Sequence, residues 1–198
     1  MEKLLNLILF LVPFISYSQS PIINLTDDDG SDEVADSYYK DIDNHLNQFE
    51  GTWLYTNASI SFKIVLIKKI MAFNGKFYED TLIGEYQYIE NGVEKINTLP
   101  IESAPNPREH NVCGNSLLNN TDRPVCGGCP FGQKRVSLFF YDPIRDRAGD
   151  LIIKKMMVGA QQAIHIRLQG QGKTYKTGTP PEYNTTTVPP GEYTLIKQ

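Results

Sequence analysis

The sequence has little of what catalytic and nucleic-acid-binding sites usually need. Its 198 residues include three histidines, three cysteines and one tryptophan. It contains neither a G-x-S-x-G nucleophile elbow nor an H-E-x-x-H metal-binding pair, which excludes two common hydrolase sites. It also lacks a basic stripe with interleaved aromatic residues, so a nucleic-acid partner is not expected. We therefore assign no catalytic residue, lean away from an enzyme and expect no cofactor, apart from a structural zinc ion considered below.

Long hydrophobic runs are absent except at the N-terminus. The run Leu4–Ile15 spans about 12 residues, whereas a bilayer needs roughly 20. It follows a weakly charged start and ends at the small-x-small sequence Ser16-Tyr17-Ser18. This pattern is typical of a secretory signal peptide over residues 1–18, cut before Gln19. We expect an exported protein, periplasmic, surface-located or secreted, without a membrane span after cleavage.

Negative charge is concentrated just after this leader. Six acidic residues and no basic residue lie between positions 27 and 36, whereas the rest of the chain is close to neutral. Such a composition is typical of a solvated linker, which we place at residues 19–35. Residues 36–198 have the length of one domain and can bury a substantial core.

The start of this domain has helical spacing. Four apolar residues would form one stripe on a helix over residues 36–49: Tyr38, Ile42, Leu46 and Phe49. Asp36 or Ser37 could cap this helix.

After Gly51 the apolar period changes from helical to alternating. Strands are expected at 52–56, 60–67, 76–80, 82–90, 93–99, 135–141, 151–158, 163–168, 173–176 and 193–197. Asn74-Gly75 and Asn91-Gly92 are strong hairpin signals. Short links favour an antiparallel meander, which covers its edges by closing as an up-and-down barrel or folding as a β-sandwich. Residues 100–134 lack periodicity and are interpreted as one irregular loop containing the cysteines.

Two resemblances extend this interpretation. Gly51-Thr52-Trp53 resembles the G-x-W start of lipocalins, whose tryptophan closes one end of a ligand-binding barrel, although the late arginine that packs on that tryptophan has no evident counterpart. Nearly the whole chain resembles a family of small exported flavobacterial proteins of unknown function. The motifs behind this resemblance are GTWLYTN (51–57), GEYQYIENGVE (84–94), the Cys-x-x-Cys loop, FFYDPIRD (139–146) and PPGEYTLIKQ (189–198).

The barrel prediction suggests a binding module. A small apolar ligand could contact aromatic residues on inward-facing strand positions: Trp53, Phe62, Tyr86, Tyr88 and Phe140. The alternative is a structural or interaction protein of the envelope or extracellular space, with the cysteine loop as its contact surface. His165 alternates with apolar neighbours and is expected to face solvent beside Arg167. The oligomeric state cannot be predicted.

The cysteines allow two kinds of cross-link. His110, Cys113, Cys126 and Cys129 form two close pairs whose spacing is compatible with a zinc site. An exported protein meets an oxidising compartment, which favours a disulfide instead. The disulfide could join Cys113 to either later cysteine, or join Cys126 to Cys129 and leave Cys113 free.

Overall fold

The computed structural model describes residues 20–28, 33–174 and 184–198, so the expected signal peptide at 1–18 lies outside the described residues. Most of the described chain is β-strand. The strands are β1 (Ile22–Asn24), β2 (Tyr38–Lys40), β3 (Gly51–Asn57), β4 (Ile60–Phe73), β5 (Tyr78–Glu90), β6 (Val93–Asn97), β7 (Val112–Leu118), β8 (Arg135–Asp142), β9 (Arg147–Val158), β10 (Gln161–Thr174) and β11 (Gly191–Lys197), and the 3-10 helices are η2 (Leu46–Phe49) and η3 (Pro107–Glu109). No helix among the described residues is long and apolar enough to cross a membrane.

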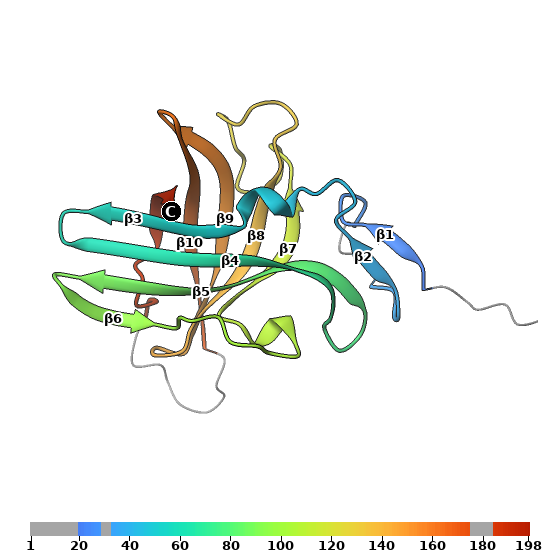
Figure 1. The fold of residues 1–198 in the computed structure, drawn as a ribbon, viewed down its shortest axis with the longest axis horizontal. Coiled ribbons are helices and arrows are strands. Elements are labelled where there is room, and N and C mark those ends of the chain that lie inside the picture. The colour runs from blue at the N-terminus through green and yellow to red at the C-terminus, as the bar shows by residue number, and fades with distance from the viewer. Residues whose placement is uncertain (1–19, 29–32, 175–183) are drawn as a thin grey trace, which may run out of the picture.

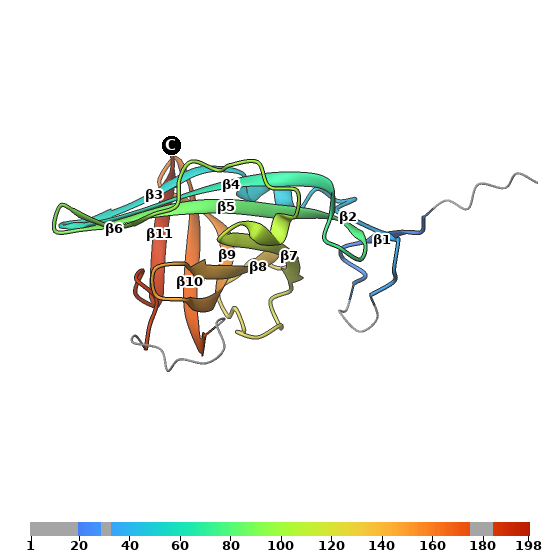
Figure 2. The ribbon, with the colours of Figure 1, turned by 90° about the horizontal axis from the view of Figure 1, so that it is seen from below.

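Eight of the strands form a closed antiparallel barrel. Around the ring the order is β3, β4, β5, β7, β8, β9, β10 and β11, with β11 paired to β3 and β5 paired to β7. Strand β6 pairs with β5 beside the ring (Figure 1). Figure 2 shows β3, β4 and β5 nearly edge-on, with β8 to β11 crossing below them. The predicted up-and-down barrel is confirmed and the sandwich alternative is not adopted.

Alternating side chains fill the barrel interior. The largest fully buried side chains that pack in this core are Leu46, Phe49, Trp53, Phe62, Ile64, Leu66, Leu82, Tyr86, Tyr88, Leu138 and Phe140. Fully burying one large apolar side chain contributes about 1.5–3 kcal/mol, so this set supplies much of the driving force for folding. The alternating apolar residues of the sequence therefore mark the strand positions that face the barrel interior.

Both predicted hairpin turns are present. Strand β4 turns into β5 around Asn74-Gly75, and Phe73 pairs with Tyr78 across the turn. At Asn91-Gly92, Glu90 pairs with Val93, and both central residues have positive φ, 54° and 73°. Positive φ at both positions is what a type I′ turn requires, which explains the Asn-Gly sequence.

The helix expected over residues 36–49 is wrong for most of its length. Residues 38–40 instead form β2, which pairs in parallel with the start of β5. The Asp41 carboxylate then accepts hydrogen bonds from the backbone amides of His45 and Leu46, at 2.8 and 2.9 Å, and only the last turn is a 3-10 helix. Ile42, placed on the apolar stripe, is 51% exposed. Pairing with β5 overrides the helical spacing of these residues.

The irregular loop expected at 100–134 contains a strand. Residues 112–118 form β7, which pairs with β8 and closes the barrel against β5. The sequence VCGNSLL does not alternate, because the register shifts between Cys113 and Ser116 where a bulge interrupts the pairing with β8. The strand is therefore specified by its partners rather than by its own pattern.

The segment expected to be a linker, residues 19–35, contains the short strand β1. This strand pairs in parallel with β2, so β1 and β2 extend the sheet beyond the ring (Figure 1). Leu25 directly after β1 is buried in the core cluster. Burial of Leu25 ties this part of the segment to the domain.

Asp80 on β5 attaches the N-terminal segment to the barrel. Its carboxylate accepts hydrogen bonds from the Tyr38 hydroxyl at 2.5 Å and from the backbone amides of Asp41 and Met71, both at 3.0 Å. Asp80 is 2% exposed, so water does not compete for these donors. One buried acceptor thus joins β2, the turn after it and β4.

We expect Asp80→Ala to lower the free energy of unfolding by about 3 kcal/mol. The substitution leaves three hydrogen-bond donors without their acceptor, and two of these hydrogen bonds are buried. Urea unfolding followed by circular dichroism measures this change. Asp43→Ala, which removes an exposed carboxylate bonded to Asn24, should change stability by less than about 0.5 kcal/mol. Equal losses in the two variants would contradict the anchoring role of Asp80.

Candidate functional site

The five aromatic residues predicted to line a ligand site all lie in the barrel core. Each side chain is at most 1% exposed. Phe62 meets Tyr86 and Tyr88 edge-on, with ring centroids 6.3 and 6.4 Å apart, and Tyr86 packs on Phe140 at 4.6 Å. The structure thus brings these four rings together as packed core residues.

Trp53 lies where η2 meets β3. Its indole N–H donates to the Phe49 carbonyl oxygen at 2.8 Å. The ammonium groups of Lys155 and Lys197 each lie 5.3 Å from the ring centroid. Both lysines make cation–π contacts with the indole ring.

The cysteines adopt one of the predicted disulfide arrangements. Cys126 is bonded to Cys129, and Cys113 is a buried free thiol whose pKa is raised to about 11 by burial. His110 Nδ1 lies 3.3 Å from a Glu85 carboxylate oxygen. The zinc alternative requires both of these sulfurs as thiolate ligands, and in this structure they form the disulfide instead. Among the described residues no group of three or more His, Cys, Asp or Glu is placed to hold a metal ion.

The loop that carries the disulfide is held over the barrel by Arg135. This guanidinium donates to the backbone carbonyl oxygens of Asn119, Asp122 and Pro124 at 2.5, 2.9 and 2.6 Å. The Asn120 side chain donates to two further carbonyls of the loop. Because Arg135 is only 3% exposed, these charge-assisted bonds are shielded from water. The loop is thereby fixed against the outer face of the barrel.

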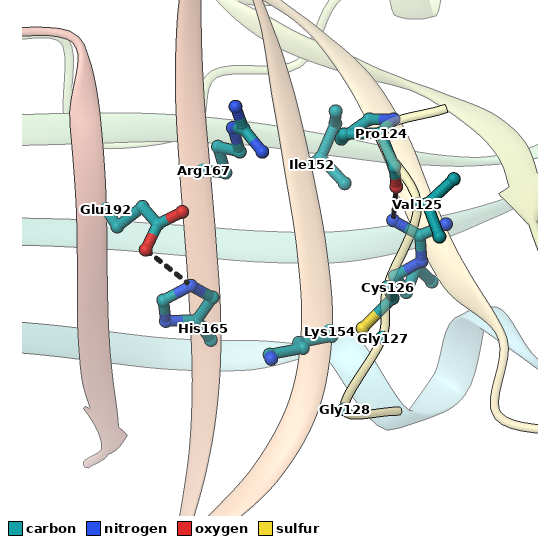
Figure 3. Close-up of a pocket in the computed structure, with 11 residues that line it drawn as sticks. Pro124, Val125, Cys126, Gly127, Gly128, Ile152, Lys154, His165, Arg167 and Glu192 are labelled. Atoms are coloured by element: carbon teal, nitrogen blue, oxygen red, sulfur yellow. Dashed lines mark hydrogen bonds and ion pairs between the residues drawn. The ribbon is translucent and has the colours of Figure 1, made fainter. Parts of the chain in front are cut away.

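A pocket of about 240 Å³ lies between this loop and the outer face of β9, β10 and β11. The loop forms one wall, and Lys154, His165, Arg167 and Glu192 project from the three strands (Figure 3). In Figure 3 the ammonium end of Lys154 lies between His165 and the loop. We name this space the loop pocket.

The loop pocket is predominantly cationic. Lys154, Arg167 and the Arg135 guanidinium line it, and Glu192 is the one acidic residue among its lining residues. Glu192 lies 3.7 Å from His165 Nε2. Burial and then the nearby Lys154 charge lower the pKa of His165, while Glu192 partly opposes them. At neutral pH the pocket therefore presents positive charge with a neutral imidazole that can donate or accept a hydrogen bond.

The sequence pattern did not predict this pocket. It placed His165 and Arg167 together on the outer face of one strand, and both line the loop pocket. It expected His165 to face solvent, whereas the side chain is 24% exposed beneath the loop. Lys154 and Glu192 were missed because strand neighbours and the loop that covers them are set by long-range contacts.

Comparison with known proteins gives a family for the whole chain. A family of unknown function, DUF6705, matches residues 1–198. The chain belongs to this family. The expected resemblance to a family of unknown function over nearly the whole chain is thus confirmed. No curated protein and no solved structure matches the DUF6705 chain.

Thiol titration checks the cysteine assignment. We expect folded protein to show no fast-reacting thiol, because Cys113 is buried and has a raised pKa. Unfolding without reductant should expose one thiol, and unfolding with prior reduction should expose three. Three thiols without reduction in protein recovered from an oxidising compartment would contradict the disulfide.

The titration of His165 checks the electrostatics of the loop pocket. We expect an NMR midpoint below about 6.5, raised in Lys154→Gln and lowered further in Glu192→Gln, with Lys95→Gln on β6 as a matched control. Since the folded pKa lies below the unfolded value, the folded form binds protons less readily. The contribution of His165 to stability should therefore fall as the pH drops below about 6.5. A midpoint unchanged in both pocket variants would contradict this assignment.

Proposed function

We propose that the protein is an exported, non-catalytic binding module that holds a small anionic ligand in the loop pocket. The observation that carries this proposal is that Lys154, His165 and Arg167 line one pocket, under a loop fixed by Arg135. Positive groups arranged around a concave site attract and orient anions. A carboxylate, sulfate or phosphate group is the ligand chemistry that fits these donors.

Two features support export. Residues 1–18 have the pattern of a secretory signal peptide. The Cys126–Cys129 disulfide is a cross-link that persists in oxidising compartments and is rare in reducing ones. A binding module outside the cytoplasm accommodates both features.

The barrel interior is the second candidate site, for a small apolar ligand. One observation favours it: the Tyr88 hydroxyl is buried without a hydrogen-bond partner among the described residues. Against it, the aromatic side chains expected to form the walls are packed on one another. A ligand there would have to displace core rings, which costs several kcal/mol, so the loop pocket is the better supported site.

The test is an NMR titration with sodium sulfate, sodium phosphate and sodium acetate at constant ionic strength. We expect saturable shifts of the amides of residues 154, 165 and 167, with affinity reduced about tenfold in Lys154→Gln and in Arg167→Gln. Lys95→Gln should bind as the wild type does. Shifts that are absent, or that persist unchanged in both pocket variants, would reject the anion site. Shifts confined to core residues such as Tyr88 on addition of a fatty acid would favour the interior instead.

A further inference from the structure

A second cleft lies on the outer face of the barrel where β5 separates from β7. The two strands pair over only three positions, from Leu82↔Gly114 to Gly84↔Val112. Toward its start β5 leaves β7 and pairs with β2 instead. The Asn115 side chain bridges the separation by donating to Glu79 Oε2 at 2.8 Å and to the Asp80 carbonyl oxygen at 2.9 Å. A concave space therefore opens beside the point of barrel closure.

This space, which we name the seam cleft, has a volume of about 460 Å³. Its floor is formed by outward-facing residues of β5, β7 and β8, and η3 forms its rim with Pro107 and Arg108. Phe139 and the buried Cys113 contribute apolar surface, and Ser116 and Ser137 contribute hydroxyls. A mixed lining of this kind is typical of sites for small organic molecules.

Glu79 is the buried charge of the seam cleft. It is 8% exposed, and its two carboxylate oxygens accept hydrogen bonds from the side-chain amides of Asn74 and Asn115 at 3.0 and 2.8 Å. No ion pair to Glu79 exists within the described part of the chain. Burial raises the pKa of Glu79, whereas the two amides and the more distant Arg108 charge lower it. A buried carboxylate without a cation in contact is a costly arrangement that a cationic ligand group would relieve.

Arg108 supplies the opposite charge at the rim. Its side chain is exposed, and its backbone amide donates to Asn106 Oδ1, which caps η3. Across ranges 20–28, 33–174 and 184–198 its guanidinium forms no ion pair. The cleft thus carries a carboxylate in its interior and a guanidinium at its entrance, with an aromatic ring in its lining.

We propose that the seam cleft binds a small zwitterion of the amino-acid class. The ligand's ammonium group contacts Glu79, its carboxylate contacts Arg108, and its apolar side chain lies on Phe139 and Pro107. Glu79 selects the ammonium group because no cation among the described residues forms an ion pair with it, and the planar guanidinium of Arg108 fits a carboxylate. This site is separate from the loop pocket, whose lining residues it does not share.

The experiment is a calorimetric and NMR titration of the mature protein with a panel of the common amino acids. For the tightest binder we compare the amino acid with its amine and carboxylic acid analogues. For leucine these are 3-methylbutylamine and 4-methylpentanoate. We expect the zwitterion to bind at least about tenfold more tightly than either analogue, with amide shifts at residues 81 and 116.

Single-residue variants distinguish a loss of ligand binding from a loss of folding. Glu79→Gln and Arg108→Gln should each weaken binding of the zwitterion at least about tenfold, and Glu94→Gln on β6 should leave it unchanged. Arg108 is exposed, so its variant is expected to fold even if Glu79→Gln does not. The proposal is overturned if no amino acid gives saturable shifts up to about 10 mM, if an analogue binds as tightly, or if Arg108→Gln binds like the wild type. Anion binding in the loop pocket is measured by its own variants, so the two proposals fail independently.

Discussion

Closure of the barrel between β5 and β7 is the constraint on which the rest of the structure depends. Only three residue pairs join these strands, and glycines occupy two of the positions. Gly114 on the β7 side has φ 139°, a conformation that side-chain-bearing residues rarely adopt. On the β5 side, a Cβ on Gly84 would lie 2.6 Å from the Val65 carbonyl oxygen of β4. The backbone of the seam therefore requires a glycine at position 114, and the close packing of β5 on β4 requires one at position 84. Without the seam the inward-facing aromatic residues would be exposed along two open edges.

The sequence predicted the strands far better than their connections. Alternation in Ile164, Ile166 and Leu168 identified the inward face of β10 because these three side chains are at most 1% exposed. Helical spacing over residues 36–49 was misleading, since the Asp80 carboxylate and pairing with β5 hold residues 38–40 extended. Strand β7 was missed for a related reason: its bulge and Gly114 remove the alternation that would have revealed it. In both cases a long-range partner decides the conformation, and a local pattern does not contain that partner.

The candidate sites also divide into residues that a local pattern identifies and residues whose surroundings depend on long-range contacts. The aromatic residues proposed from the sequence are core residues, because alternation marks what is inside a barrel and does not show whether the inside is hollow. His165 and Arg167 were placed on the outer face correctly, but nothing local indicates that the loop of residues 119–134 covers them. That position depends on Arg135, whose guanidinium joins three carbonyl groups of the loop. A disulfide between residues three apart closes too short a ring to fix the loop by itself, so the arginine sets where the loop lies.

Both clefts are built by one segment of the chain. Residues 100–134 supply η3 at the rim of the seam cleft, then β7, which closes the barrel, and then the disulfide loop that walls the loop pocket. Strands β3 to β5 and β8 to β10 follow one another through short hairpins and mainly bury apolar side chains. In a filled barrel, concave surface has to form on the outside, and here it forms where the segment that departs from alternation lies against the strands. Residues 100–134 therefore shape both clefts, whereas most of the charged side chains that line them lie on β5, β8, β9, β10 and β11. Since Val112 and Cys113 of this segment are buried, it contributes to the core as well as to the surface.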